Sequence, residues 1–150
     1  LLRLKAAATS VDDFTQGSFQ PVIAEHAELD GNAVDKVLLV SGRLYYDLLA
    51  NRQKAGDEKT AIIRVEQLYP LPYKEIQDAV AKYPNAELVW AQDEPANQGP
   101  WPFIGLNLPP ELDRPLRLVS RPASASTATG SAKRHAVEQD ILVKKAFERR

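Results

Sequence analysis

Short apolar runs alternate with segments of helical periodicity through the middle of the chain, and this pattern restricts the fold more than any other feature. Residues 36–40 (KVLLV), 60–65 (TAIIRV) and 87–91 (ELVWA) have the length and composition of strands. The first of them is continuously apolar, as in a strand that is buried on both faces. Residues 43–54 and 73–83 each place large apolar side chains on one helix face. The alternation predicts an α/β three-layer sandwich with a mostly parallel sheet, whose βα crossovers are right-handed.

The remaining segments extend this pattern at both ends. Residues 115–120 (PLRLVS) alternate apolar and polar side chains, which predicts a strand at the sheet edge. Residues 121–130 are small and polar, as in a loop, and Ser131 is placed to cap a last helix that ends near Glu148.

The beginning of the chain is less regular. Residues 19–23 contain Pro21 and fit a short edge strand, and residues 30–32 (DGN) form a turn signal. We therefore interpret residues 1–33 as a lead-in segment from an upstream domain and residues 34–150 as the α/β domain.

Composition excludes several classes of function. The net charge of −1 leaves no overall basic surface for nucleic acid, and no apolar run approaches the length of a membrane span. The chain has no cysteine, so disulfides and thiolate metal sites are excluded. His26 and His135 are far apart in the chain, which argues against a multi-histidine zinc site. The chain starts at Leu1 and contains no methionine, which suggests a piece of a longer polypeptide or an engineered version of one.

Polar and cationic residues follow the predicted strands, where ligands bind in parallel α/β sheets. Ser41, Gly42 and Arg43 lead from a strand into a helix, and backbone N–H groups beside a guanidinium suit a phosphate. Alternatively, Gly42 only permits the turn. Side chains expected to add charge or polar contacts around the same edge are Arg64, Gln67, Lys74, Arg117 and Arg121.

The stretch 87–103 begins as an apolar strand and continues into a polar segment rich in proline, glycine and tryptophan. Asp93 and Glu94 are candidates for a general acid and a general base, but adjacent side chains on a strand diverge, which argues against a shared-proton pair. Asn97, Gln98 and Trp101 follow them. The alternative is a plain structural loop, because Pro and Gly are good turn formers.

A single histidine in the last helix, His135, fits a surface or supporting position better than a catalytic one. The hydroxyl-rich residues 124–131 lack a nucleophile-elbow motif, so we interpret them as a small-residue linker packed against a neighbour. Residues and spacing alone therefore predict an α/β domain with a polar, partly cationic edge and no complete catalytic set.

Three separated motifs carry a family resemblance: DEPANQGPW (93–101), RPASAS (121–126) and KRH (133–135). VSGRLYYDL (40–48) and EQLYPLP (66–72) fit the same family. Over residues 34–148 the chain resembles the C-terminal domain of the thiamine-diphosphate-dependent E1 component of 2-oxoglutarate dehydrogenase. It is most similar to the actinobacterial form, a multifunctional enzyme in which E1 is fused to a succinyltransferase-like domain.

This resemblance implies a transketolase C-terminal fold and a cytoplasmic enzyme of the tricarboxylic acid cycle. In the family, two preceding domains hold thiamine diphosphate and Mg²⁺, decarboxylate 2-oxoglutarate and pass the succinyl group to lipoyl groups. The implied partners are a second E1 copy in a homodimer, the dihydrolipoyl acyltransferase (E2), dihydrolipoamide dehydrogenase (E3) and an FHA-domain regulator.

The resemblance also implies roles for individual residues. The third domain of actinobacterial members takes part in binding acetyl-CoA, an allosteric activator, and the cationic strand-end edge suits its phosphates. The residues assigned to that contact are Ser41, Arg43, Gln67, Lys74 and Arg121. Those assigned to an interface or to the approach to the active site are Asp93, Glu94, Asn97, Gln98, Trp101 and His135.

Two other interpretations remain open on sequence grounds. One is a stand-alone α/β module that binds an anion or a nucleotide. The other is an engineered scaffold without activity, which would account for the absence of methionine and cysteine.

Overall fold

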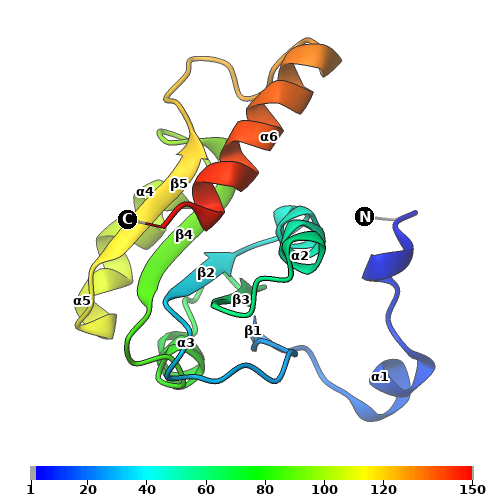
Figure 1. Cartoon of the computed structure of the whole chain (residues 1–150), viewed down its shortest axis with the longest axis vertical. Coiled ribbons are helices and arrows are strands. Elements are labelled where there is room, and N and C mark those ends of the chain that lie inside the picture. The colour runs from blue at the N-terminus through cyan, green and yellow to red at the C-terminus, as the bar shows by residue number, and fades with distance from the viewer. Residues whose placement is uncertain (1–2, 150) are drawn as a thin grey trace.

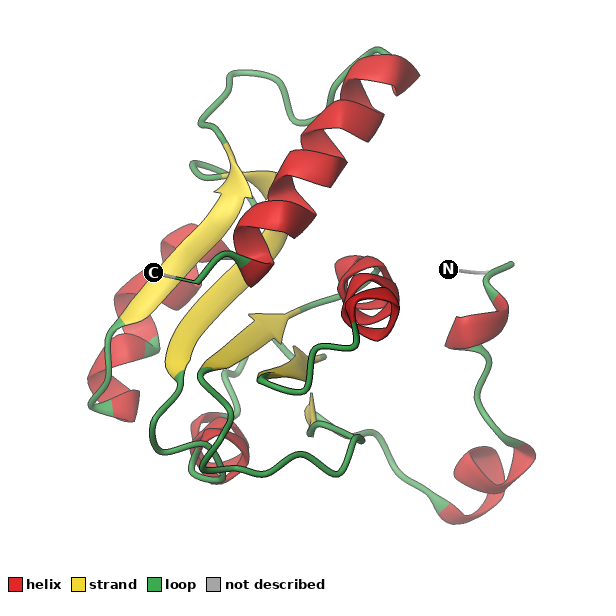
Figure 2. Ribbon diagram, viewed as in Figure 1, coloured by secondary structure: helices red, strands yellow, loops and turns green. Residues whose placement is uncertain are grey.

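A single sheet of five strands, in the order β1-β3-β2-β4-β5, organises residues 3–149, which are the residues that this computed structural model describes (Figures 1 and 2). Four strands are parallel, and only β1 runs antiparallel to its neighbour β3. The mostly parallel sheet is therefore confirmed. The strands are β1 (Val22–Ile23), β2 (Lys36–Val40), β3 (Thr60–Val65), β4 (Glu87–Pro95) and β5 (Leu116–Arg121).

Helices cover both faces of the sheet, as Figure 1 shows. On one face, α2 (Leu44–Ala55) and α6 (Ala132–Phe147) pack over Leu38, Val40 and Val89. On the other, α3 (Tyr73–Val80), α4 (Trp101–Asn107) and α5 (Pro109–Leu112) pack over a core that contains Leu39, Ile63 and Trp90. Because neighbouring strand residues point to opposite faces, β2 supplies both cores and is buried throughout.

Most predicted elements lie where the sequence pattern placed them. β2 and β3 match residues 36–40 and 60–65, β5 is an edge strand, and Ser131 caps α6 by accepting a hydrogen bond from Arg134 N. The strand expected within residues 19–23 is β1, at the opposite edge of the sheet.

The region after residue 91 differs from the prediction. β4 continues to Pro95, which pairs with Arg121 in β5 after a register shift. Asp93 and Glu94 therefore lie inside the strand, and not at its exit. Two helices, α4 and α5, also follow β4. α4 begins inside the stretch 87–103, whose end was interpreted as a loop, and α5 lies among residues for which the sequence predicted no element. Prolines fit the first turn of a helix, where no N–H donor is needed.

The N-terminal arm, residues 3–20, lies outside the sheet at the right of Figures 1 and 2, and its first residues return to the neighbourhood of Gly42 and Arg64. It contains a 3₁₀ turn, η1 (Lys5–Ala7), and the short helix α1 (Val11–Gln16), and none of its residues is buried. The chain joins the sheet at Pro21, whose carbonyl accepts hydrogen bonds from the backbone N–H groups of Glu66 and Gln67.

Candidate functional site

The turn between β2 and α2 lies at the carboxyl end of the sheet. Gly42 has a φ of +68°, a left-handed conformation that a residue with a Cβ adopts only with strain. Arg43 follows at the start of α2, where its guanidinium is half exposed and lies 3.0 Å from the Asp47 carboxylate. The first turn of α2 thus presents a cation beside the positive end of the helix dipole, an arrangement that favours anions.

The end of β3 adds an aromatic and cationic cluster beside that turn. Arg64 stacks over the rings of Tyr45 and Tyr46 at 4.8 and 5.8 Å, and its Nε donates to Glu66 at 2.8 Å. A cavity of about 420 Å³ lies here, and its wall includes Gly42 as well as Leu4 of the N-terminal arm. Arg64 was expected at this edge, and the cavity beside it was not.

Gln67 and Lys74 come from the connection between β3 and α3. The Gln67 side chain donates to the Pro70 carbonyl at 2.6 Å. Lys74 is 81% exposed and pairs with Asp78, one helical turn away. Because α3 and α2 cover opposite faces of the sheet, Lys74 and Arg43 lie on opposite faces, both near the carboxyl ends of the strands.

A chain of hydrogen bonds joins Arg43 to Arg121. Asp47 accepts from Arg43 and from Gln139 of α6, whose amide oxygen accepts from Arg121 at 2.9 Å. Arg121 is 9% exposed, and its terminal nitrogen also lies 3.1 Å from His135 Nδ1. Since a guanidinium can only donate, Nδ1 accepts, so the structure places His135 in a supporting contact with Arg121.

Gln92 organises the segment that follows β4, although its place at a polar strand end did not predict this structural role. Its side chain is 3% exposed, and its oxygen accepts from Trp90 Nε1 at 3.1 Å and from Trp101 N at 2.9 Å. Its amide nitrogen donates to the carbonyls of Pro95 and Gln98. The one available signal was a glutamine inside an apolar strand, because a buried amide needs several partners.

Asn97 and Gln98 attach this segment to the loop between β5 and α6. The Asn97 amide exchanges two 3.0 Å hydrogen bonds with the backbone of Ser124. Gln98 donates to the Ser124 carbonyl at 2.7 Å and to that of Ser126 at 3.3 Å. Both carboxamides therefore have structural partners within the chain.

The side chains of Asp93 and Glu94 have different environments. Glu94 is exposed and its side chain packs against Gly99, whereas Asp93 is partly buried and its Oδ1 has no hydrogen-bond partner among residues 3–149. Trp101, which was expected in the loop, is the first residue of α4.

Within the described part of the chain, no group of three or more acidic, histidine or cysteine side chains is placed to hold a metal, so these residues do not fit an Mg²⁺ site. Nor does any helix between residues 3 and 149 have the length and apolar character needed to cross a membrane.

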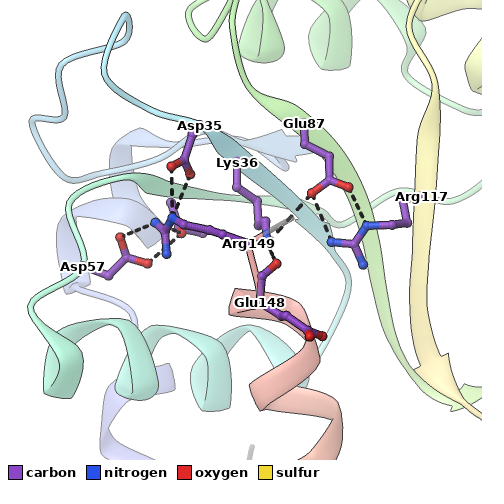
Figure 3. Close-up of polar contacts among 8 residues, drawn as sticks. Asp35, Lys36, Asp57, Glu87, Arg117, Glu148 and Arg149 are labelled. Carbon is purple, nitrogen blue, oxygen red and sulfur yellow. Dashed lines mark hydrogen bonds and ion pairs between the residues drawn. The ribbon is translucent and has the colours of Figure 1, made fainter.

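Arg117 was expected at the carboxyl ends of the parallel strands. It lies instead near their amino ends, because it is close to the start of β5 (Figure 3). It forms two hydrogen bonds to Glu87, the first residue of β4. The adjacent Lys36 is 1% exposed, donates to the carbonyl of Glu148 and lies 3.9 Å from Glu87. Figure 3 shows that this network, together with Arg149, ties the end of α6 to the start of the sheet.

Comparison with known proteins identifies the family. The 2-oxoglutarate dehydrogenase C-terminal family matches residues 8–147, which is most of the chain. The chain belongs to this family. The 2-oxoglutarate dehydrogenase E1/E2 component of Corynebacterium glutamicum is 49% identical over 99% of this chain and 12% of its own length. The multifunctional 2-oxoglutarate metabolism enzyme of Mycobacterium sp. (strain JLS) is 43% identical over 98% of this chain and 12% of its own length. The E1 component of Cupriavidus necator is 43% identical over 98% of this chain and 16% of its own length.

A solved structure supports the fold of this 2-oxoglutarate dehydrogenase C-terminal domain. A split-gene transketolase, an inactive beta4 tetramer, superposes with a TM-score of 0.53 over 85% of this chain and 42% of its own, at 14% identity. The transketolase-like fold expected from the sequence is therefore confirmed. The chain spans less than a fifth of the length of the curated relatives described above.

Proposed function

We propose that the chain acts as the C-terminal domain of a 2-oxoglutarate dehydrogenase E1 component within a longer polypeptide. The observation that carries this proposal is the 49% identity to an E1/E2 component over 99% of the chain. In this role the domain has no catalytic set of its own. Thiamine diphosphate and Mg²⁺ are held by the other domains, which decarboxylate 2-oxoglutarate and transfer the succinyl group to the lipoyl groups of E2, with E3 completing the cycle. The domain helps to shape the E1 homodimer and the approach to its active site, and an FHA-domain protein is a candidate regulator.

The carboxyl edge of the sheet is proposed to bind acetyl-CoA as an allosteric effector. Arg43 and Lys74 are exposed cations at this edge, whereas the guanidinium of Arg121 is buried and already engaged. From β3 to β5 the edge spans three strand spacings, about 14 Å, so only a long ligand reaches its whole width. In this arrangement Ser41, Arg43, Gln67 and Lys74 contact the ligand, and Arg121 holds Gln139 and thereby Asp47, the partner of Arg43.

Calorimetric titration of acetyl-CoA into the full-length enzyme carrying Arg43→Ala tests this site. We expect the affinity to fall about tenfold, because a charge-assisted contact to a phosphate is lost. Lys54→Ala is the matched control, since Lys54 is an exposed cation at the opposite end of α2. Equal affinities of the two variants would remove Arg43 from the site.

The role as a dependent domain is tested with the 150-residue chain alone. We expect no decarboxylation of 2-oxoglutarate by this chain, even with thiamine diphosphate and Mg²⁺ added. Size-exclusion chromatography with and without acetyl-CoA separates the alternatives, because a stand-alone binding module would bind acetyl-CoA as a soluble monomer. Measurable decarboxylation by the isolated chain would contradict the proposal.

A further inference from the structure

A second and larger cavity lies between α6 and the β5–α6 loop, residues 122–131. In Figure 1 this loop leaves the end of β5 and returns to the first turn of α6. The helix contributes Leu142 and a stripe of four residues spaced three or four apart, which therefore share one helix face: Arg134, Glu138, Ile141 and Lys145. His135 and Gln139, which contact Arg121 in the network toward α2, are not part of this stripe. The cavity therefore shares Arg121 with the network toward α2, whereas its exposed cations, Arg134 and Lys145, lie on a different face of α6 from His135 and Gln139.

The charged groups in the wall of this cavity favour an anion. Three cations line it, Arg121, Arg134 and Lys145, against one carboxylate, that of Glu138. Glu138 is already engaged, because it accepts from the Thr129 hydroxyl and from Arg134 Nε. These two hydrogen bonds hold the pKa of Glu138 below its ordinary value, so the carboxylate stays charged and the excess of positive charge in the wall is two.

Arg121 provides an independent sign of a missing partner. Its side chain is nine-tenths buried, and its Nε–H is a buried donor without an acceptor among residues 3–149. Buried donors in proteins are nearly always paired, so this unpaired one marks an incompletely satisfied part of the cavity wall, although the Nε atom itself is shielded from solvent. The other guanidinium nitrogens are held by α6, so the group is fixed in place before a ligand arrives.

The remaining wall indicates what kind of anion fits. Six serine and threonine side chains line the cavity, and hydroxyl groups bind phosphate oxygens well. Pro95, Pro122, Ile141 and Leu142 supply apolar surface that a bare inorganic ion would leave uncovered. The volume of about 660 Å³ falls in the range of about 300–1,000 Å³ that is usual for small-molecule sites.

We propose that this cavity binds a small organic phosphate. The phosphate lies between Arg134, Lys145 and the part of the wall that contains Arg121. The organic part packs against Ile141, Pro95 and Pro122. The site goes beyond the proposed function, because its wall shares Arg121 but not Ser41, Arg43, Gln67 or Lys74 with the residues assigned to acetyl-CoA, and it does not require acetyl-CoA.

Titration of the 150-residue chain with phenyl phosphate, followed by ¹H–¹⁵N NMR, tests this proposal. We expect saturable shifts at residues 122–134 and at residues 141–145. The double variant Arg134→Gln, Lys145→Gln should bind at least about tenfold more weakly, since two charge-assisted contacts are lost. Both side chains are exposed, so the variant is expected to fold normally.

Lys144→Gln is the matched control, because Lys144 neighbours Lys145 but pairs with Asp140 outside the cavity wall. It should bind phenyl phosphate as the parent chain does. Benzoate, an anion with the same ring, should bind more weakly than phenyl phosphate because it carries one charge and fewer acceptor oxygens. The proposal is overturned by the absence of saturable binding in the millimolar range, by equal binding to the double variant, or by shifts confined to the Ser41–Arg43 turn. Binding of an acidic peptide in preference to phenyl phosphate would also overturn it and point to a protein partner.

Discussion

Gln92 shows how one buried amide determines the conformation of the segment after β4. It satisfies two donors, Trp90 Nε1 and Trp101 N, and two acceptors, the carbonyls of Pro95 and Gln98. Replacement by leucine keeps the approximate volume but leaves these groups unpaired. We expect Gln92→Leu to lower the free energy of unfolding by about 3 kcal/mol, measured by urea denaturation. Gln53→Leu, at an exposed position of α2, is the control and should change stability by less than about 0.5 kcal/mol. Equal effects of the two substitutions would contradict the role assigned to Gln92.

Lys36 is a buried cation at the amino end of the sheet, and its burial lowers its pKa below the ordinary value of 10.5 despite the nearby Glu87 carboxylate. Between the folded-state pKa and 10.5 the unfolded chain binds more protons than the folded chain. The burial penalty of the charged amine is therefore present at lower pH and disappears as the pH rises through this window.

Lys36→Met removes that penalty, while Arg117 remains to pair with Glu87. We expect the variant to be as stable as the parent chain at pH 7, or more stable by about 1 kcal/mol, with any advantage shrinking as the pH approaches 10.5. Urea denaturation at a series of pH values measures this, with the exposed Lys59→Met as control. An advantage that grows with pH would contradict the account.

At the residue scale, the kinds of side chain near the strand ends were easier to predict from the sequence than the residues that these side chains contact. Arg43 and Ser41 follow an apolar strand, so their position at the carboxyl edge follows from the pattern alone. The partners of Arg121, which come from α6 and through it from α2, depend on how helices distant in sequence pack together. Arg117 was placed at the wrong end of the sheet because it was grouped with the cations that follow strands, although its position early in residues 115–120 already indicated the amino end.

At the scale of elements, Glu25 fastens the segment after β1 to both α2 and β3. Its carboxylate is nearly buried, pairs with Arg52 of α2, and accepts from Ile62 N of β3 at 2.8 Å. Burial by itself raises the pKa of Glu25, but the hydrogen bonds from Arg52, Ala27 and Ile62 outweigh it and hold the pKa below the ordinary value of 4.5. The segment before β2 is thus part of the folded unit from Pro21 onward.

We expect Glu25→Gln to lower the free energy of unfolding by about 3 kcal/mol at pH 7, because Arg52 is left buried without its counter-charge. Since the folded-state pKa is lowered, this contribution is fully present above pH 4.5 and is lost as the pH falls through the folded value. Parent and variant should therefore converge in stability in acid. The exposed Glu28→Gln provides the comparison, and a difference that persists unchanged at low pH would count against the ion pair.

Among the elements, the strands with continuous apolar runs were the most predictable, because burial on both faces leaves an unmistakable pattern. The extension of β4 to Pro95 was missed because its last residues are polar and pair with β5 only after a register shift. α4 and α5 were missed because their prolines also suit turns, and only the packing of Ile104, Leu108 and Leu112 under the sheet distinguishes the two.

At the scale of the whole molecule, the sheet differs between the amino ends of its parallel strands, called the amino edge here, and their carboxyl ends, called the carboxyl edge. The amino edge is closed by ion pairs that fix the end of α6, whereas the carboxyl edge carries exposed cations, two cavities and the N-terminal arm nearby. This asymmetry supports the proposal that ligands or other domains contact the carboxyl ends of the strands.

The most direct test of the central claim is transplantation into a relative. The C-terminal segment of the Corynebacterium glutamicum E1/E2 component that aligns with this chain would be replaced by residues 1–150, and 2-oxoglutarate decarboxylation measured with thiamine diphosphate and Mg²⁺ present. The same enzyme truncated before that segment is the control. We predict that the chimaera regains decarboxylation which the truncated enzyme lacks. A chimaera that is folded by circular dichroism and yet as inactive as the truncated enzyme would contradict the account.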